Sequence, residues 1–198
     1  MTVTGSGVAR EENDRMIETG VVYGRFQVLH LKHMEYILAA KMRCRKLYIG
    51  ITLPDDIYKP EDEELNYRTK RNANPLTYFE RFEMIEEAVL DFGVPRDSFD
   101  IIPFPIDRPR YIRQYSPRDA VYFMSICDEW TQENERLFAE LGLEMEVLWR
   151  RERKEKGITG TQIRQRILAG EPWSDLVPKS VYEYIVSHRI DSRIRFTK

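Results

Sequence analysis

The sequence predicts an α/β fold built on an open parallel sheet with helices on both faces. Short β-rich runs alternate with helical patterns along the chain, and two of the helices begin with capping residues. Such alternation is typical of βαβ units, whose strands run parallel. A chain of 198 residues is long enough to bury a sizeable core. We therefore expect a polar N-terminal tail over residues 1–19 and one domain over residues 20–198.

Five short runs are expected to form the strands, because they combine apolar, β-branched and aromatic residues. They cover residues 21–23, 47–51, 101–104, 121–124 and 145–149. Helical patterns lie between and after them. These patterns cover residues 31–42, 77–92, 134–141, 159–169 and 181–186. Two charged segments without clear periodicity, residues 53–74 and 107–118, are expected to be loops.

Two of the helices carry a capping box at their start. Thr77 with Glu80, and Thr159 with Gln162, have the spacing at which two side chains each satisfy a backbone N–H at the helix start. The helix after Thr77 then presents an apolar stripe that is expected to face the core. The stripe consists of Phe79, Phe82, Ile85 and Val89.

The composition excludes several classes of protein. The formal net charge is −2, from 31 basic and 33 acidic residues, which argues against general nucleic-acid binding. No apolar run approaches the roughly 20 residues of a membrane span, and the polar N-terminus has no signal-peptide core. Cys44 and Cys127 are the only cysteines, so neither a disulfide framework nor a zinc site is expected. These features predict a cytoplasmic protein.

The junction of the first predicted strand and helix carries residue types that bind phosphate. The run from Gly24 to His33 reads GRFQVLHLKH, and open α/β sheets bind ligands at such junctions. His30 and His33 share one face of the first helical turn, and with Arg25 they can donate hydrogen bonds to phosphate oxygens. No acidic or thiol partner has metal-motif spacing with them, so no metal site is expected. The alternative is a pair of surface or packing histidines.

A second cluster marks the start of the predicted helix over residues 159–169. Its sequence from Ile158 to Arg164 is ITGTQIR. Thr161 and Arg164 share a face, and hydroxyls, free N–H groups and a guanidinium are suitable donors for a triphosphate. The alternative is an ordinary capped helix with a solvated arginine.

Together the two clusters resemble the GRFQPxHxGH and (S/T)xTxIR signatures of nucleotidylyltransferases, in particular the archaeal-type nicotinamide mononucleotide adenylyltransferases. Residues 74–81 resemble the DPFTxxER segment of that family, and residues 173–181 resemble its C-terminal stretch. The similarity runs in order from about Val21 to about Ile185.

The resemblance implies a Rossmann-like fold of the nucleotidylyltransferase type, with the triphosphate between the two motifs and a Mg²⁺ ion beside it. It implies His30, His33 and Arg164 as catalytic residues. The nucleotide-binding residues it implies are Gly24, Arg25, Phe26, Gln27, His30, His33, Thr159, Gly160, Thr161 and Arg164. In such an enzyme an acceptor oxygen attacks the α-phosphorus and pyrophosphate leaves. Catalysis then depends on positioning and charge stabilisation, without a protein nucleophile.

The sequence departs from this family at several positions. Val28 and Lys32 stand where Pro and Gly are usual, and Lys32 is expected either to point to solvent or to add a phosphate contact. The Asn and Trp that hold nicotinamide mononucleotide are missing from residues 106–115, and the turn over residues 124–131 is longer than usual. Ala73 takes the place of an arginine, with Arg68 or Arg71 nearby.

The acceptor side is therefore the rewritten half of the predicted site. Its expected acceptor-binding residues are Arg108, Arg110, Tyr111, Arg113 and Trp130. Three arginines in one loop suit a phosphorylated, anionic acceptor, and a tryptophan can stack on an acceptor ring. The alternatives are a solvated basic loop and a tryptophan that packs in the core.

Three functions remain open from the sequence, each compatible with a homo-oligomer. The first is transfer of AMP from ATP to a phosphate-bearing acceptor, by default nicotinamide mononucleotide, as in NAD biosynthesis. The second is a relative that uses CTP or a non-nicotinamide phosphorylated or phosphonate acceptor in a biosynthetic pathway. The third is a nucleotide-sensing module without turnover, which the presence of His30, His33 and Arg164 disfavours.

Overall fold

The computed structural model of the chain describes residues 16–53, 73–152, 155 and 157–196. A five-stranded sheet has the order β3-β2-β1-β4-β5, and every neighbouring pair of strands is parallel. The strands are β1 (Ile17–Gly24), β2 (Cys44–Thr52), β3 (Phe99–Phe104), β4 (Val121–Ile126) and β5 (Met145–Arg150). The predicted α/β fold class and all five predicted strands are confirmed.

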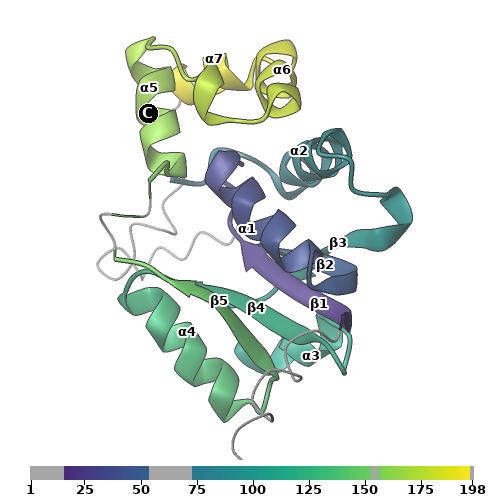
Figure 1. Cartoon of the computed structure of the whole chain (residues 1–198). Helices are drawn as coiled ribbons and strands as arrows, with labels where there is room; N and C mark the ends of the chain where they lie inside the picture. Colours follow the sequence, from purple (N-terminus) through teal and green to yellow (C-terminus); the bar gives the residue numbers. More distant parts are fainter. Residues whose placement is uncertain (1–15, 54–72, 153–154, 156, 197–198) are drawn as a thin grey trace, which may run out of the picture.

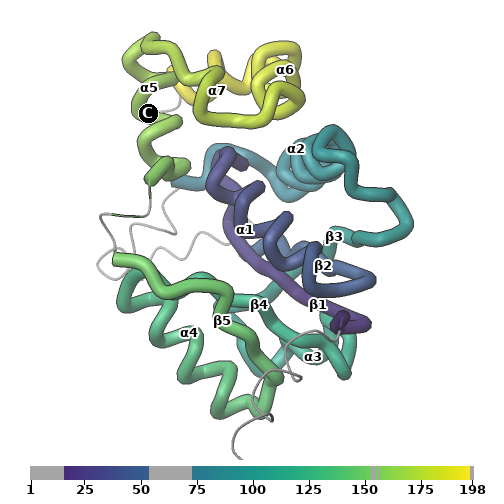
Figure 2. The backbone as a smooth tube through the Cα atoms, in the orientation of Figure 1, coloured from purple at the N-terminus to yellow at the C-terminus, as the bar shows by residue number. Residues whose placement is uncertain are grey.

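Helices cover both faces of this sheet (Figure 1). They are α1 (Leu31–Lys41), α2 (Tyr78–Asp91), α3 (Ile112–Tyr115), α4 (Glu129–Glu140), α5 (Gly160–Ala169), α6 (Lys179–Ser187) and α7 (Ile190–Phe196). Helices α1 and α2 lie on one face and α3 and α4 on the other, while α5, α6 and α7 gather beyond α1 and α2 (Figure 2). None of the helices in the described ranges is long and apolar enough to span a bilayer.

The alternation of side chains along β1 produces two separate cores. Val22 belongs to a cluster with α1, α2 and the C-terminal helices, whereas Val21 and Tyr23 belong to a cluster with Phe138 of α4. Successive side chains of a strand point to opposite faces, so each strand of this buried sheet supplies both clusters. This explains why the predicted strands are nearly continuous apolar runs.

Several predicted boundaries require correction. Strand β1 begins at Ile17, which pairs with Cys44, so residues 17–19 belong to the sheet and not to a polar tail. Helix α4 begins at Glu129 instead of residue 134, and the loop over residues 107–118 contains α3. Helix α7 has no counterpart among the predictions. The remaining residues of the predicted tail, and most of the loop over residues 53–74, lie outside the described residues.

The stripe predicted for α2 is only partly correct. Ile85 and Val89 are buried, but Phe79 is 64% exposed and Arg81 is only 3% exposed. The buried face of α2 is therefore centred on Arg81, Met84 and Ala88. A charged residue at the centre of a helix face defeats a prediction made from apolar spacing alone.

The C-terminal helices brace the first face of the molecule. Arg193 of α7 forms two hydrogen bonds with the Glu80 carboxylate, of 2.8 and 2.7 Å. Arg195 donates to the Ile167 carbonyl oxygen of α5, at 2.9 Å. One short helix thereby ties the start of α2 to the helix that carries the second motif.

The order of strands places a ligand site at the end of β1. Strands β2 and β3 continue the sheet to one side of β1, and β4 and β5 continue it to the other. Where the order reverses, the connections leave in opposite directions and open a crevice at the carboxyl ends of the strands. The first motif follows Gly24, the last residue of β1.

Candidate functional site

The two motif histidines form a stacked pair at the start of α1. His30 is the N-cap residue, and its Nδ1 accepts a hydrogen bond from the His33 backbone N–H at 3.2 Å. The two ring centroids are 3.6 Å apart with an interplanar angle of 12°. Because Nδ1 of His30 accepts, the proton of its neutral imidazole is on Nε2. An Nε2–H group is a donor of the kind that binds a phosphate oxygen.

The residues before the histidines act through their backbone and packing. Phe26 is 1% exposed, and its ring lies edge-on to His33 with 5.0 Å between centroids. A Cβ at Gly24 would lie 2.9 Å from two atoms of the Phe26 ring, so a glycine is needed there for this packing. The Phe26 ring is therefore part of the core, so a contribution of Phe26 to the predicted nucleotide cleft would come from its backbone.

Gln27 holds the first motif against the chain that leads into α2. Its side-chain amide donates to the Leu76 carbonyl oxygen and accepts from the Leu76 N–H, both at 2.9 Å. This pairing imitates a backbone ladder and uses both ends of the amide. The Gln27 side chain therefore has a positioning role, and a nucleotide contact of Gln27 would have to come from its backbone.

The second motif meets the first through Gly160. Thr159 is the N-cap of α5, and the predicted capping box with Gln162 is present. A Cβ at Gly160 would lie 2.8 Å from the Gln27 carbonyl carbon and 2.9 Å from the Val28 nitrogen. Only glycine allows the start of α5 to approach the first motif this closely.

Arg164 connects the two motifs directly. It is 7% exposed, and its guanidinium donates to the Gln27 carbonyl oxygen and to Thr161 Oγ1, the latter at 3.2 Å. The structure thus brings the histidines, Thr161 and Arg164 to one junction, as the motifs predict. A planar guanidinium that makes two such hydrogen bonds is held in a set orientation.

Arg81 is a positioning residue that the sequence analysis did not identify. Its guanidinium donates to the carbonyl oxygens of Arg25 at 3.0 Å, Thr52 at 2.8 Å and Leu53 at 2.8 Å. It therefore joins the first motif to the end of β2. Burial lowers the pKa of Arg81 to about 10, so the group is still charged at neutral pH. The DPFTxxER-like segment ends at this arginine, which was the available signal.

Lys32, at the family's glycine position, belongs to an ion cluster. Its Nζ lies 2.6 Å from Glu35 Oε2, and Arg151 Nη2 lies 2.6 Å from Glu35 Oε1. The Arg151 guanidinium, and after it Lys32, hold the pKa of the Glu35 carboxyl below its usual value. The Lys32 side chain is therefore partly exposed and paired with Glu35. The expected alternative, a phosphate contact, stays a prediction.

The predicted acceptor residues are divided between two ends of the sheet. Arg108 and Arg110 are exposed and follow the carboxyl end of β3, and Arg110 packs its guanidinium 4.9 Å from the Tyr111 ring centroid. Arg113 instead donates to the carbonyl oxygens of Leu141 and Gly142, at 3.0 and 2.9 Å. These carbonyls precede β5, at the amino end of the sheet. The prediction that Arg113 binds the acceptor is therefore wrong, since Arg113 caps the end of α4.

Trp130 lies in the first turn of α4. It is partly buried and packs against the second core cluster, which favours the packing alternative over ring stacking.

No group of three or more His, Cys, Asp or Glu residues that could hold a metal ion occurs in the described part of the chain. The donors at the two motifs are imidazoles, hydroxyls and guanidinium groups, which suit anions rather than cations.

Comparison with protein families decides between the motif resemblance and coincidence. The model of the cytidylyltransferase-like family matches residues 21–166, which include both motifs. The chain belongs to the cytidylyltransferase-like family. It is therefore a nucleotidylyltransferase, as the paired motifs predict, and both motifs lie within the matched residues.

Two curated relatives illustrate the range of this cytidylyltransferase-like family. The chain is 41% identical to the phosphonoformate cytidylyltransferase of Streptomyces viridochromogenes, over 92% of this chain and 98% of the relative. It is 30% identical to the nicotinamide-nucleotide adenylyltransferase of Saccharolobus solfataricus, over 89% of this chain and 94% of the relative.

A solved structure supports the fold of this family member. The bifunctional NMN adenylyltransferase/ADP ribose pyrophosphatase of Francisella tularensis, complexed with AMP and an Mn ion, aligns with a TM-score of 0.63 at 16% identity. The alignment covers 91% of this chain and 52% of the longer one. The similarity therefore concerns the nucleotidylyltransferase fold alone.

Proposed function

We propose that the chain transfers CMP from CTP to a small acceptor that carries a phosphonate group and an additional negative charge. The observation that carries this proposal is the 41% identity with a phosphonoformate cytidylyltransferase over nearly the whole of both chains. The identity with nicotinamide-nucleotide adenylyltransferases is about 30%. The second of the functions left open by the sequence is thereby favoured over the first.

The acceptor side of the structure supports a small anionic acceptor. Trp130 is packed against the second core cluster, so an acceptor ring is not needed to account for it. Arg108 and Arg110 are exposed beyond the carboxyl end of β3. Phosphonoformate has no ring, and its two anionic groups match two guanidinium groups better than a stacking surface.

The reaction follows from the donors that surround the two motifs. A phosphonate oxygen attacks the α-phosphorus of CTP and forms a new P–O bond. The bond between the α-phosphorus and the bridging oxygen to the β-phosphorus breaks, and pyrophosphate leaves with the electron pair. His30, His33 and Arg164 stabilise the charge that develops on the transferring and leaving groups. Thr161 and the free N–H groups at the start of α5 hold the leaving group.

A divalent cation would enter as part of the nucleotide substrate. Mg²⁺ binds substrate phosphates and keeps several waters, so it needs few protein ligands. The described residues at the motifs offer no carboxylate cluster, and no step is assigned to the ion. This chain itself supplies the acceptor specificity and the two motifs that hold the triphosphate.

A panel of pyrophosphate-release assays tests the proposal. MgCTP, MgATP, MgGTP and MgUTP are each combined with phosphonoformate, nicotinamide mononucleotide and acetate as a non-phosphorylated control. We expect turnover with MgCTP and phosphonoformate in excess of every other pair. Preferred turnover of MgATP with nicotinamide mononucleotide would instead support the adenylyltransferase alternative, and triphosphate binding without turnover would support the sensing module.

A further inference from the structure

We propose that Lys32, Glu35 and Arg151 form a positioning cluster that fixes the second motif against the first and thereby sets the affinity for the triphosphate. The proposal adds three residues to the site described above. It depends on the proposed function only in taking a nucleoside triphosphate as the ligand of the two motifs. Lys32 acts through its contact with Gly157, and Glu35 and Arg151 act by fixing the position of Lys32.

The stem of Lys32 contacts the segment that leads into the second motif. A Cβ at Gly157 would lie 3.2 Å from Lys32 Cε and 3.7 Å from its Cγ. Three residues later, Gly160 packs on the Gln27 backbone. Gly157 and Gly160 therefore both face the first motif, one against a side chain and one against the backbone. The usual glycine at position 32 would remove the first of these contacts.

Arg151 holds the other oxygen of the Glu35 carboxylate. This residue directly follows β5 and stacks on Trp149 with 4.3 Å between its guanidinium carbon and the ring centroid. Its Nη2 is 2.6 Å from Glu35 Oε1, while Lys32 Nζ is 2.6 Å from Glu35 Oε2. One carboxylate on α1 thus joins the first turn of that helix to the end of β5.

The exposure of the cluster makes it suitable for substitution. The side chains of Lys32, Glu35 and Arg151 are 40%, 35% and 31% exposed, so their replacement is expected to leave the core intact. Single exposed ion pairs have small effects on stability. An effect on the relative placement of the two motifs would appear instead in triphosphate binding, because both motifs contact that ligand.

The competing explanation is that Lys32 and Arg151 bind phosphate directly and that Glu35 only occupies them between turnovers. The two explanations give opposite signs for Glu35→Gln. A positioning cluster loses its central carboxylate, so the triphosphate binds more weakly. Direct phosphate ligands would be released from a competing anion, so the triphosphate would bind more tightly.

Calorimetric titration with MgCTP and with MgATP provides the test, together with melting curves and steady-state kinetics. We expect Glu35→Gln and Lys32→Met each to weaken binding of the preferred triphosphate about fivefold, without a change in the acceptor KM. Lys32→Arg should retain nearly the wild-type affinity, because it keeps a cation within reach of Glu35. Unchanged or tighter triphosphate binding by Glu35→Gln would overturn the proposal, as would an equal rise in the acceptor KM.

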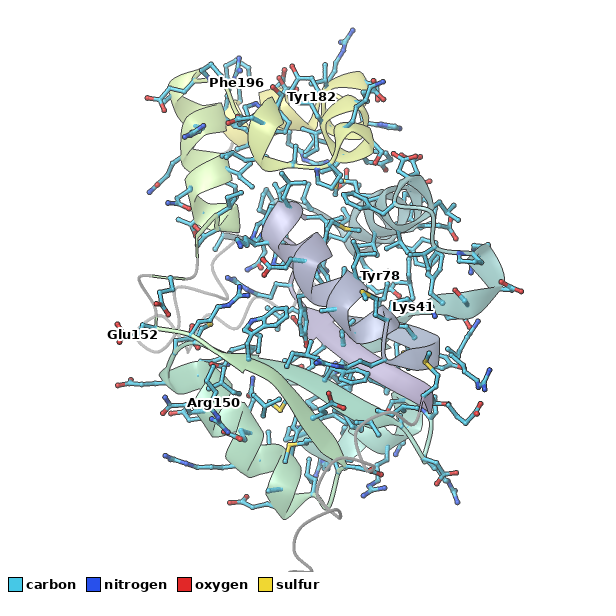
Figure 3. All side chains as sticks on the ribbon, viewed as in Figure 1. Lys41, Tyr78, Arg150, Glu152, Tyr182 and Phe196 are labelled. Carbon is cyan, nitrogen blue, oxygen red and sulfur yellow. The ribbon has the colours of Figure 1, made fainter. Side chains whose placement is uncertain are left out.

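Glu135→Gln is the matched control. It breaks the ion pair between Arg150 and Glu135 of α4. Arg150, which is labelled in Figure 3, directly precedes Arg151 in the chain. The triphosphate affinity of Glu135→Gln should equal that of the wild type. A wild-type protein that binds neither triphosphate would refute the proposed function and this inference together. Wild-type binding that Glu35→Gln leaves intact would refute the inference alone.

Discussion

The proposed phosphate-binding and acceptor-binding sides of the site are built differently. On the first side, Arg81 of α2 and Arg164 of α5 are almost fully buried, and each donates to the backbone of the first motif. On the second side, beyond β3, Arg108 and Arg110 are exposed. The phosphate side is fixed by many contacts from distant segments, and the acceptor side is held by few.

This difference shows which part of the chemistry the fold itself determines. Every nucleotidylyl transfer requires the same geometry around the α-phosphorus, so its donors must be held rigidly. The acceptor differs between relatives named for phosphonoformate and for nicotinamide nucleotide. Side chains that project from a short exposed segment can be exchanged without disturbing the core.

The largest effect should follow loss of a phosphate-side donor. We expect His33→Ala to lower kcat about 100- to 1,000-fold while the melting temperature stays close to that of the wild type. Pyrophosphate release and a melting curve measure the two quantities. His188→Ala is the control, since His188 stacks on Tyr184 in the C-terminal helices. Comparable kcat values in the two variants would remove His33 from the site.

A second large effect should follow loss of the buried Arg81 guanidinium, which holds the backbone of the first motif. Arg81→Lys leaves the carbonyl oxygens of Arg25, Thr52 and Leu53 without most of their donors, because an ammonium group cannot reach all three. We expect the free energy of unfolding to fall by about 3 kcal/mol, which denaturant titration can measure. Arg96→Lys, at an arginine whose side chain is 50% exposed, should change it little. If both variants unfold alike, the buried guanidinium is not a support.

A smaller, pH-dependent effect is expected at the brace between α2 and α7. Burial alone would raise the pKa of Glu80, but Arg193 and the Thr77 backbone N–H together hold it below its usual value. The stabilisation is therefore present at neutral pH and is lost as pH falls through the lowered pKa. Glu80→Gln preserves the capping box and should destabilise the protein by about 1 kcal/mol at pH 7.

Melting curves over a pH series check this expectation. The difference between wild type and Glu80→Gln should shrink as pH falls below about 4. Glu183→Gln is the control, because the Glu183 side chain is 61% exposed and its ion pair is with Lys179 of the same helix. A difference that stays constant from pH 7 to pH 3 would contradict the role of the Glu80 charge.

The smallest effects should separate two arginines that the sequence places in one loop. Arg110→Ala should raise the acceptor KM roughly three- to tenfold and leave the melting temperature unchanged. Arg113→Ala should leave the acceptor KM unchanged and lower the stability by about 1 kcal/mol, because it uncaps α4. The reverse assignment of the two effects would show that the acceptor lies elsewhere.

Local patterns were sufficient to predict the sheet and both motif helices. The runs around Val22 and Ile49 alternate between two cores, and each capping box forms as expected. The burial of Arg81 could not be predicted in this way, because its partners are carbonyl oxygens of β2 and of the first motif. Tertiary contacts of that kind leave no periodic signal in the sequence.

The same distinction applies to the site. His30, His33 and Arg164 could be proposed as site residues because the motifs that carry the family resemblance are local in the sequence, and their roles stay predictions. Arg113 was placed wrongly because a loop sequence does not reveal toward which end of a sheet each side chain points. Gln27 was assigned to the ligand although its amide pairs with Leu76, a residue 49 positions away. Only the three-dimensional fold reveals that pairing.

The missing side chain at Gly160 has a consequence for changing the enzyme's substrate range. Any larger residue would have to displace the Gln27 backbone or move α5 outward, and the proposed triphosphate site between the two motifs would change with it. Laboratory evolution toward new acceptors should therefore keep position 160 constant. Substitution libraries are better confined to residues 106–111, where side chains can change without altering the spacing of the proposed catalytic groups.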